Sequence, residues 1–84
     1  MISEKANQEI RIQEVATQYL SQKKHWQPNE YRLEYKGMTE NGKFYVVWAI
    51  YLDDEIHPKP GSGRSVSLQI EPKENRVVSE LRWQ

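Results

Sequence analysis

The 84-residue chain contains no cysteine, so it has neither a disulfide framework nor thiolate chemistry. Its longest uncharged apolar run, residues 44–52, is far too short to span a membrane. Twelve basic residues balance twelve acidic ones, which leaves no basic field to attract nucleic acid or an anionic membrane surface. At 84 residues the chain is long enough for one compact domain and too short for two, so we expect a single α+β domain, residues 1–84. Hydrophobic residues make up only 37% of the chain, so we expect the core of this domain to be thin. Polar residues near the N-terminus interrupt any signal-peptide pattern, and we therefore expect a cytoplasmic protein or the mature fragment of a longer precursor.

The first segment of the chain has the composition of a helix. Residues 3–22 contain neither glycine nor proline and are rich in Glu, Gln, Lys and Ala. Apolar residues recur there at helical spacing and predict one buried stripe: Ile12, Val15, Ala16, Tyr19 and Leu20. Pro28 disfavours a helical conformation at Gln27, so the helix should end before it.

Two segments with strand-like alternation follow, residues 30–36 and 43–52. Asn41-Gly42 between them is typical of a two-residue type I′ turn. A turn of that length fixes the register and makes one face of the hairpin wholly apolar, and we expect that face to hold the helix. The predicted pairs are Tyr35 with Trp48, Leu33 with Ile50 and Tyr31 with Leu52.

Residues 53–64 hold two prolines, two glycines and an acidic triplet, and they predict a long exposed connection. Residues 65–71 and 76–83 alternate again and predict a second hairpin with a turn at 72–75. Its predicted pairs are Ile70 with Val77, Leu68 with Ser79 and Val66 with Leu81. The predicted fold is one N-terminal helix packed on a four-stranded antiparallel meander. The sheet residues expected against the helix are Leu33, Trp48, Ile50, Val66, Leu68 and Leu81.

No segment of the chain has the spacing of a catalytic or metal site. Residues 53–57 contain four potential oxygen or nitrogen ligands, but they lack the glycine and distal Glu of an EF-hand, so we interpret them as a solvated acidic loop. Residues 60–65 superficially resemble a phosphate cradle without its Lys-Ser/Thr ending or a following helix. His25 and His57 have no nucleophile or paired carboxylate at a spacing that would form a relay. We expect neither an enzyme nor a metal or other cofactor.

The face of the first hairpin away from the helix is the better candidate for function. It combines apolar and aromatic side chains with basic ones, a composition typical of protein interfaces. The candidate protein-binding residues are Arg32, Lys36, Met38, Tyr45, Val47, Tyr51 and Val78. Aromatic residues beside basic ones can also stack nucleic-acid bases, but Glu34 and the acidic triplet argue against that reading. A third interpretation is that long arginine side chains merely cover the patch.

Several segments together resemble a known group of small domains. They are residues 44–48 (Phe-Tyr-Val-Val-Trp), a Gly-rich gap, residues 66–71 (Val-Ser-Leu-Gln-Ile-Glu) and residues 75–78 (Asn-Arg-Val-Val). In this order, after a helix, they are similar to cystatin-like domains, most of all to bacterial PepSY-like and NTF2-fold immunity modules. The resemblance implies the fold and a binding role, and it carries over no functional residue. Asn75 stands where such families often have glycine, and Asn41-Gly42-Lys43 does not supply the Gln-x-Val-x-Gly hairpin of cystatin inhibitors.

These observations predict a non-catalytic protein-binding module of the inhibitor or immunity type. It would dock on a protein partner through the outer sheet face or through residues 53–64. The alternative is a small-ligand-binding or enzymatic domain with a pocket between helix and sheet. In a third arrangement, self-association as a homodimer covers the sheet with a second copy of the chain.

Overall fold

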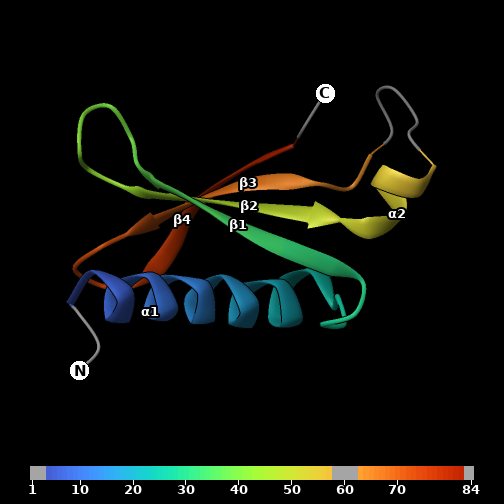
Figure 1. Ribbon diagram of the computed structural model, residues 1–84, viewed down its shortest axis with the longest axis horizontal. Coiled ribbons are helices and arrows are strands. Elements are labelled where there is room, and N and C mark those ends of the chain that lie inside the picture. The colour runs from blue at the N-terminus through green and yellow to red at the C-terminus, as the bar shows by residue number, and fades with distance from the viewer. Residues whose placement is uncertain (1–3, 58–62, 83–84) are drawn as a thin grey trace.

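The computed structural model describes residues 4–57 and 63–82 and shows an N-terminal helix packed on a four-stranded antiparallel sheet (Figure 1). The helix α1 spans Glu4–Tyr19 and continues as a π-helical turn, η1, over Leu20–Lys24. The strands are β1 (Tyr31–Met38), β2 (Tyr45–Tyr51), β3 (Val66–Glu71) and β4 (Arg76–Arg82), and a short helix α2 (Leu52–Ile56) follows β2. Three parts of the predictions lie outside the described residues: helix residue 3, strand residue 83 and residues 58–62 of the predicted connection 53–64.

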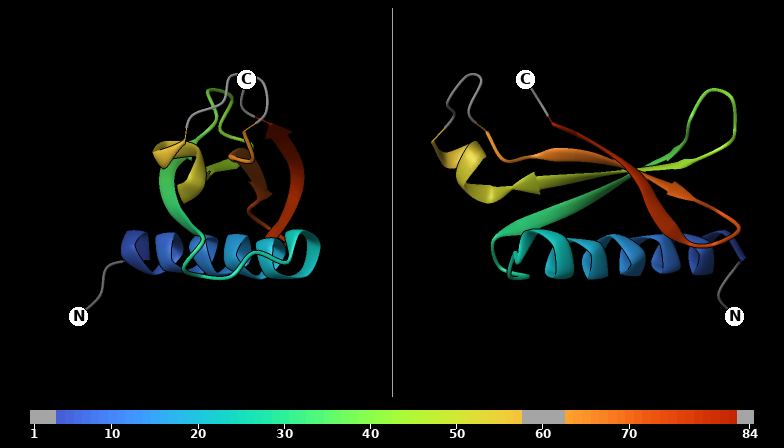
Figure 2. Two further views of the ribbon diagram at one scale, coloured as in Figure 1. Left: turned by 90° about the vertical axis from the view of Figure 1, so that its right-hand side faces the viewer. Right: turned by 180° about the vertical axis from the view of Figure 1, so that it is seen from behind.

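The strands lie in the order β1-β2-β3-β4, so each pairs with its neighbour in sequence and the predicted α+β meander is confirmed. The sheet is strongly curved and arches over α1, with β1 and β4 descending on its two sides (Figure 2). One sheet face therefore packs on the helix, and we call the opposite one the outer face. None of the described helices is long and apolar enough to cross a membrane.

The buried stripe of α1 lies where its sequence period places it. Ile12, Ala16 and Leu20 are at most 1% exposed, and Val15 and Tyr19 pack against them from the sides. The helical segment ends at His25, which adopts a left-handed conformation (φ 57°) and donates its backbone N–H to the carbonyl of Leu20. The predicted helix is thus confirmed, with a π-helical last turn that the sequence pattern does not indicate.

The first hairpin differs from its predicted register because β1 contains a bulge. Near the tip, Met38 pairs with Tyr45 as in the predicted register. On the N-terminal side of Lys36 the register is shifted by one residue, so Tyr35 pairs with Val47. Gly37 adopts a φ of 86°, a conformation that glycine takes without strain, and glycine inside a strand is a common sign of a bulge. All three predicted pairs are therefore wrong: Tyr35 pairs with Val47, Leu33 with Ala49 and Tyr31 with Tyr51.

The tip is also longer than a two-residue turn. The backbone N–H of Thr39 bonds to the carbonyl of Phe44 over 2.8 Å, so four residues connect the arms, and only Gly42 among them has a positive φ. A type I′ turn needs a positive φ at both central residues, so that part of the prediction is wrong as well.

The one-residue slip exchanges the two faces of β2. Side chains alternate along a strand, so a shift by one residue moves the whole set to the other side of the sheet. Tyr45, Val47, Ala49 and Tyr51 consequently face the helix and are at most 8% exposed. Trp48 and Ile50, predicted to contact the helix, lie on the outer face instead, where Ile50 is nevertheless buried.

A second bulge, at Val78, does the same to β4. Ile70 pairs with Val77 as predicted, but Gln69 then pairs with Ser79 and Ser67 with Leu81. Leu81, expected in the core, is 56% exposed on the outer face. The core-facing residues of β3 hold their predicted places, since Val66, Leu68 and Ile70 are buried. The turn before β4 uses Asn75 in the left-handed region (φ 52°), so asparagine provides there the conformation that glycine usually supplies.

Candidate functional site

The seven predicted binding residues do not form one surface. Arg32 and Lys36 are exposed on the outer face of β1. Met38 is 43% exposed but shares the helix-side face of its partner Tyr45, and Val78 is 42% exposed at the β4 bulge. The other three lie in the core with exposures of 6%, 0% and 8%: Tyr45, Val47 and Tyr51. This part of the predicted patch is wrong, because it rests on the uninterrupted register.

The true outer face presents a different set of apolar residues. Register places Glu34, Trp48, Ser67 and Leu81 in one row that crosses all four strands. Val46 and Ile50 flank Trp48 on the same face of β2, because side chains two residues apart along a strand point the same way. We call the three of these apolar residues that are not buried the outer-face patch: Val46, Trp48 and Leu81. Sequence reasoning missed it, although the glycine at position 37 inside a strand pattern was the available signal.

Charged side chains line the β1 side of the outer-face patch. The ammonium group of Lys36 lies 4.2 Å from the ring centroid of Trp48, a cation–π contact. Arg32 forms ion pairs of 2.7 Å with both Glu34 and Glu55. The hydrogen bond from Arg32 holds the pKa of Glu34 below its ordinary value. The rim therefore carries mixed, mutually paired charge around an apolar centre, as protein interfaces do.

A hydrogen-bond cluster joins Asp54, in α2, to Arg64 and Ser65, which precede β3. Asp54 Oδ2 accepts hydrogen bonds from the backbone N–H of Arg64 (2.7 Å) and from the N–H and hydroxyl of Ser65 (2.7 and 2.8 Å). Partial burial acts to raise the pKa of Asp54, but these hydrogen bonds outweigh it and hold that pKa below its usual range. Ser65 Oγ in turn accepts the backbone N–H of Tyr51 over 3.0 Å. Asp54 and Ser65 thus have a structural role, because they connect α2, the start of β3 and the end of β2.

Helix α2 occupies the start of the predicted connection 53–64, where an irregular loop was expected. Its first turn contains Asp53, Asp54 and Glu55, and acidic residues stabilise the N-terminal turn of a helix. The acidic triplet was therefore a helix-start signal, in a segment first interpreted as solvated loop. Among the described residues no cluster of three or more His, Cys, Asp or Glu side chains is arranged to hold a metal ion.

Tyr51 belongs to a partly buried junction between the connection that joins η1 to β1 and the residues just before β3. Its hydroxyl donates to Glu30 Oε2 (2.8 Å) and accepts from the Arg64 guanidinium (3.0 Å), and its ring lies 4.9 Å from that of Trp26. The backbone N–H of Gln27 and the Tyr51 hydroxyl together keep the pKa of Glu30 below its ordinary value. Tyr51 therefore joins three segments inside the fold, a role incompatible with an exposed docking residue.

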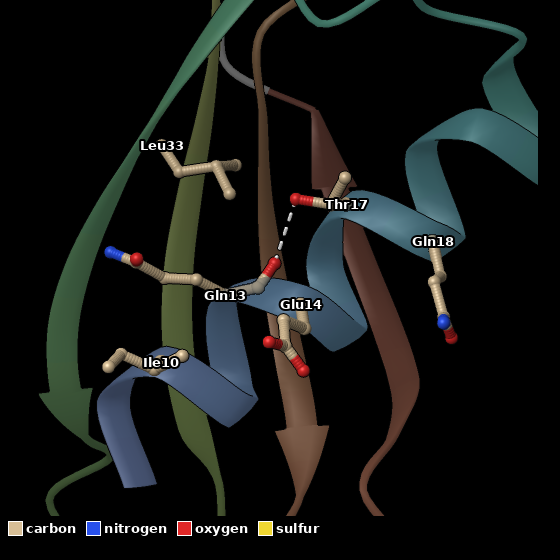
Figure 3. A pocket seen from close by; sticks show the side chains of 6 residues that line it. All are labelled: Ile10, Gln13, Glu14, Thr17, Gln18 and Leu33. Carbon is tan, nitrogen blue, oxygen red and sulfur yellow. Dashed lines mark hydrogen bonds between the residues drawn. The ribbon is translucent and has the colours of Figure 1, made fainter. Parts of the chain in front are cut away.

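Two of the surface hollows formed by the described residues lie beside α1. The larger, of about 410 Å³, runs between α1 and β1, and we call it the α1–β1 groove (Figure 3). Gln13 and Ile10 extend from the helix toward β1, and Leu33 extends from β1 toward the helix (Figure 3). A second hollow of about 310 Å³ lies at the end of the helical segment and is lined by Thr17, Ser21, His25, Trp26, Gln27, Pro28 and Tyr31. The α1–β1 groove occupies the place where the alternative prediction put a small-ligand pocket.

Comparison of the chain with protein-family models, curated proteins and solved structures finds no match in any of the three.

Proposed function

We propose that the chain is a non-catalytic protein-binding module that docks through the outer face of its sheet. The observation that carries the proposal is the cross-strand row in which Trp48 and the 56% exposed Leu81 flank the small residue Ser67. Helix α1 packs on the other face, and α2 lies at the end of β2 (Figure 1). An apolar surface of this kind, rimmed by paired charges, is typical of a protein-docking site.

The state of the carboxylates supports a role in binding over one in acid–base chemistry. Glu30, Glu34, Asp54 and Glu80 all have pKa values held below the ordinary range by hydrogen-bond donors or cations. A general acid or base at neutral pH needs a carboxyl pKa raised toward 7. These four side chains are therefore suited to ion pairing and positioning. The resemblance to small immunity modules agrees with a function exerted by holding a partner.

The proposal is tested with Leu81→Asp, which places a charge at the β4 end of the outer-face patch. Leu81 is exposed, so the variant should fold, and circular dichroism and thermal melting verify that it does. Ile56→Asp is the matched control, because Ile56 is 70% exposed on α2 and lies outside the patch. Both variants and the parent chain serve as bait in the source cell extract, and sedimentation equilibrium measures the mass of each pure protein.

We expect a protein that the parent chain and Ile56→Asp retain and that Leu81→Asp loses. If the partner is a second copy, the parent sediments above its 10.0 kDa monomer mass and Leu81→Asp returns to it. Retention and mass that are the same in Leu81→Asp as in the parent would contradict the proposal.

A further inference from the structure

The α1–β1 groove lies against the free edge of the sheet. β1 is a terminal strand in the sheet order, and among the described residues no strand pairs with its outer edge. The groove is lined by Ile10, Gln13, Glu14, Thr17, Gln18 and Leu33. Ile10 is 48% exposed, although it is a large apolar residue, and it sits at one end of this groove (Figure 3).

The backbone direction of β1 follows from one hydrogen bond at the start of the hairpin. The N–H of Leu52 donates to the carbonyl of Glu30 over 2.9 Å, which marks these two as a hydrogen-bonded antiparallel pair. Such pairs alternate along a ladder, so the next ones are Arg32 with Ile50 and Glu34 with Trp48. The residues between them direct their backbone N–H and C=O groups away from β2, toward the free edge: Tyr31, Leu33 and Tyr35.

We propose that β1 accepts an extended peptide as a fifth strand, and that the α1–β1 groove receives one apolar side chain of that peptide. This surface is distinct from the outer-face patch, so the inference goes beyond the proposed function. Addition of a strand to an exposed edge, with a neighbouring pocket for alternate side chains, is a general mode of peptide recognition.

The register requires an extended peptide as the occupant. Residues directly opposite each other on paired strands project to the same face of the sheet. A residue paired with Leu33 would therefore project to the helix side, into the groove beside Ile10 and Gln13. Only a strand supplies backbone donors and acceptors at the two-residue period that Tyr31, Leu33 and Tyr35 present.

The charges around the edge favour an uncharged peptide. Arg32 and Glu34 are paired with each other on the outer face, and Arg32 also pairs with Glu55. Of the residues that line the groove only Glu14 is charged. The β1 bulge at Lys36 ends the regular edge, so the peptide would pair along residues 31–35 and no farther.

The experiment is a selection from a displayed library of random heptapeptides on the full immobilised chain. Ile10→Asp, which puts a charge into the groove, provides the counter-selection, and Ile56→Asp is the matched control for an exposed isoleucine. The best peptide is then synthesised twice, unmodified and with a methyl group on each backbone amide that pairs with β1. Amide hydrogen exchange is followed by NMR with and without each peptide.

We expect selected peptides with an apolar residue at one fixed position. Binding should weaken by about tenfold or more in Ile10→Asp and stay unchanged in Ile56→Asp. Exchange at the amides of Leu33 and Tyr35 should slow on binding, while the amides of Arg32 and Glu34, already bonded to β2, should change little. The methylated peptide should not bind.

Three results would overturn the inference. They are a selection that enriches no peptide above background, a methylated peptide that binds as well as the unmodified one, and protection that appears away from β1. A dimer formed through β1 in the absence of peptide would assign the edge to a second copy and would equally contradict it.

Discussion

The Tyr19 hydroxyl donates a 2.7 Å hydrogen bond to Oε1 of Glu80 and so ties the last turn of α1 to the edge strand β4. Lys24 holds the other carboxylate oxygen over 2.6 Å, so a single acidic side chain connects α1 and η1 to β4. Glu80 can do this only because the Val78 bulge turns it to the helix side. Without the bulge, Ser79 and Leu81 would occupy that side.

The carboxylate raises the pKa of Tyr19 to about 12, through the hydrogen bond, partial burial and charge repulsion. Because the pKa of Tyr19 is higher in the folded than in the unfolded state, its interaction with Glu80 stabilises the fold below pH 10. This stabilisation is lost as the pH rises toward 12. We predict that Glu80→Gln lowers the Tyr19 pKa toward 10, measured by NMR titration of the tyrosine ring carbons. Glu71→Gln, on the outer face, is the control and should leave the Tyr19 pKa near 12. A Tyr19 pKa that is the same in Glu80→Gln as in the parent would contradict the assignment.

The acid side of the stability profile should depend on the same pair. Burial acts to raise the pKa of Glu80, but hydrogen bonds from Lys24 and Tyr19 outweigh it and leave the pKa lowered. The ionised carboxylate of Glu80 therefore stabilises the fold at neutral pH, and this stabilisation is lost as the pH falls through the folded-state pKa of Glu80, below 4.5. We predict that Glu80→Gln costs about 1 kcal/mol of unfolding free energy at neutral pH and that the difference from the parent narrows toward pH 3. Urea denaturation across this range measures it, and a difference independent of pH would refute the prediction.

The buried hydroxyl of Ser65 should contribute substantially to the unfolding free energy. Ser65 is 3% exposed, donates to Asp54 and accepts the N–H of Tyr51, so Ser65→Ala leaves a buried backbone donor unpaired. We predict a loss of about 1–3 kcal/mol in unfolding free energy. Ser67→Ala on the outer face is the control, with an expected change below about 0.5 kcal/mol. Equal effects of the two substitutions would show that the Ser65 bonds contribute nothing.

The two bulges, in β1 and in β4, predict which residues of the sheet carry stability. Val47 is fully buried under α1, so Val47→Ala should destabilise the fold by about 1–3 kcal/mol, whereas Leu81→Ala, at an exposed position, should cost less than about 0.5 kcal/mol. An uninterrupted register predicts the reverse order. Thermal melting of the two variants distinguishes the registers, and a larger loss in Leu81→Ala would contradict the observed one.

Gly37 should tolerate substitution poorly, although space surrounds it. No heavy atom outside its neighbourhood in the chain comes within 4 Å of a Cβ built there, so the cost of Gly37→Ala is conformational and comes from its φ of 86°. We predict a loss of about 1 kcal/mol. Gly37→Asn should lose less than Gly37→Ala, since asparagine enters positive φ more readily. Unfolding in urea provides the measurement, and Gly37→Ala as stable as the parent would rule out the bulge geometry.

The helix, the order of the strands and the core faces of β1 and β3 could all be predicted from the sequence. The helix, β1 and β3 each have one apolar and one polar side, so their periodicity indicates which side is buried. β2 has apolar residues on both sides, so its alternation could not decide which set faces the helix. Packing decides: Ala49 meets the helix in the same buried cluster as Ala16, and two small side chains allow the helix to lie close to the strand. The larger Trp48 would have to occupy that space in the predicted register.

The predicted protein-binding patch was placed on the wrong face for a related reason. Its placement depended on counting from the turn, and one inserted residue at each of two bulges reversed β2 and half of β4. Gly37 signalled the first bulge, but Val78, the extra residue of the second, has a side chain typical of any strand. Only the three-dimensional demand that Glu80 reach Tyr19 distinguishes that position.

The β1 bulge divides the first hairpin into two halves. Packing on the helix fixes the pairing of residues 31–35, and the loop at the tip fixes the pairing of residues 37 and 38. Residues added at the exposed tip between Asn41 and Gly42 would therefore leave the helix-bearing half undisturbed. That tip is a natural place to graft an epitope, a fluorophore or a tether for displaying the domain on a surface.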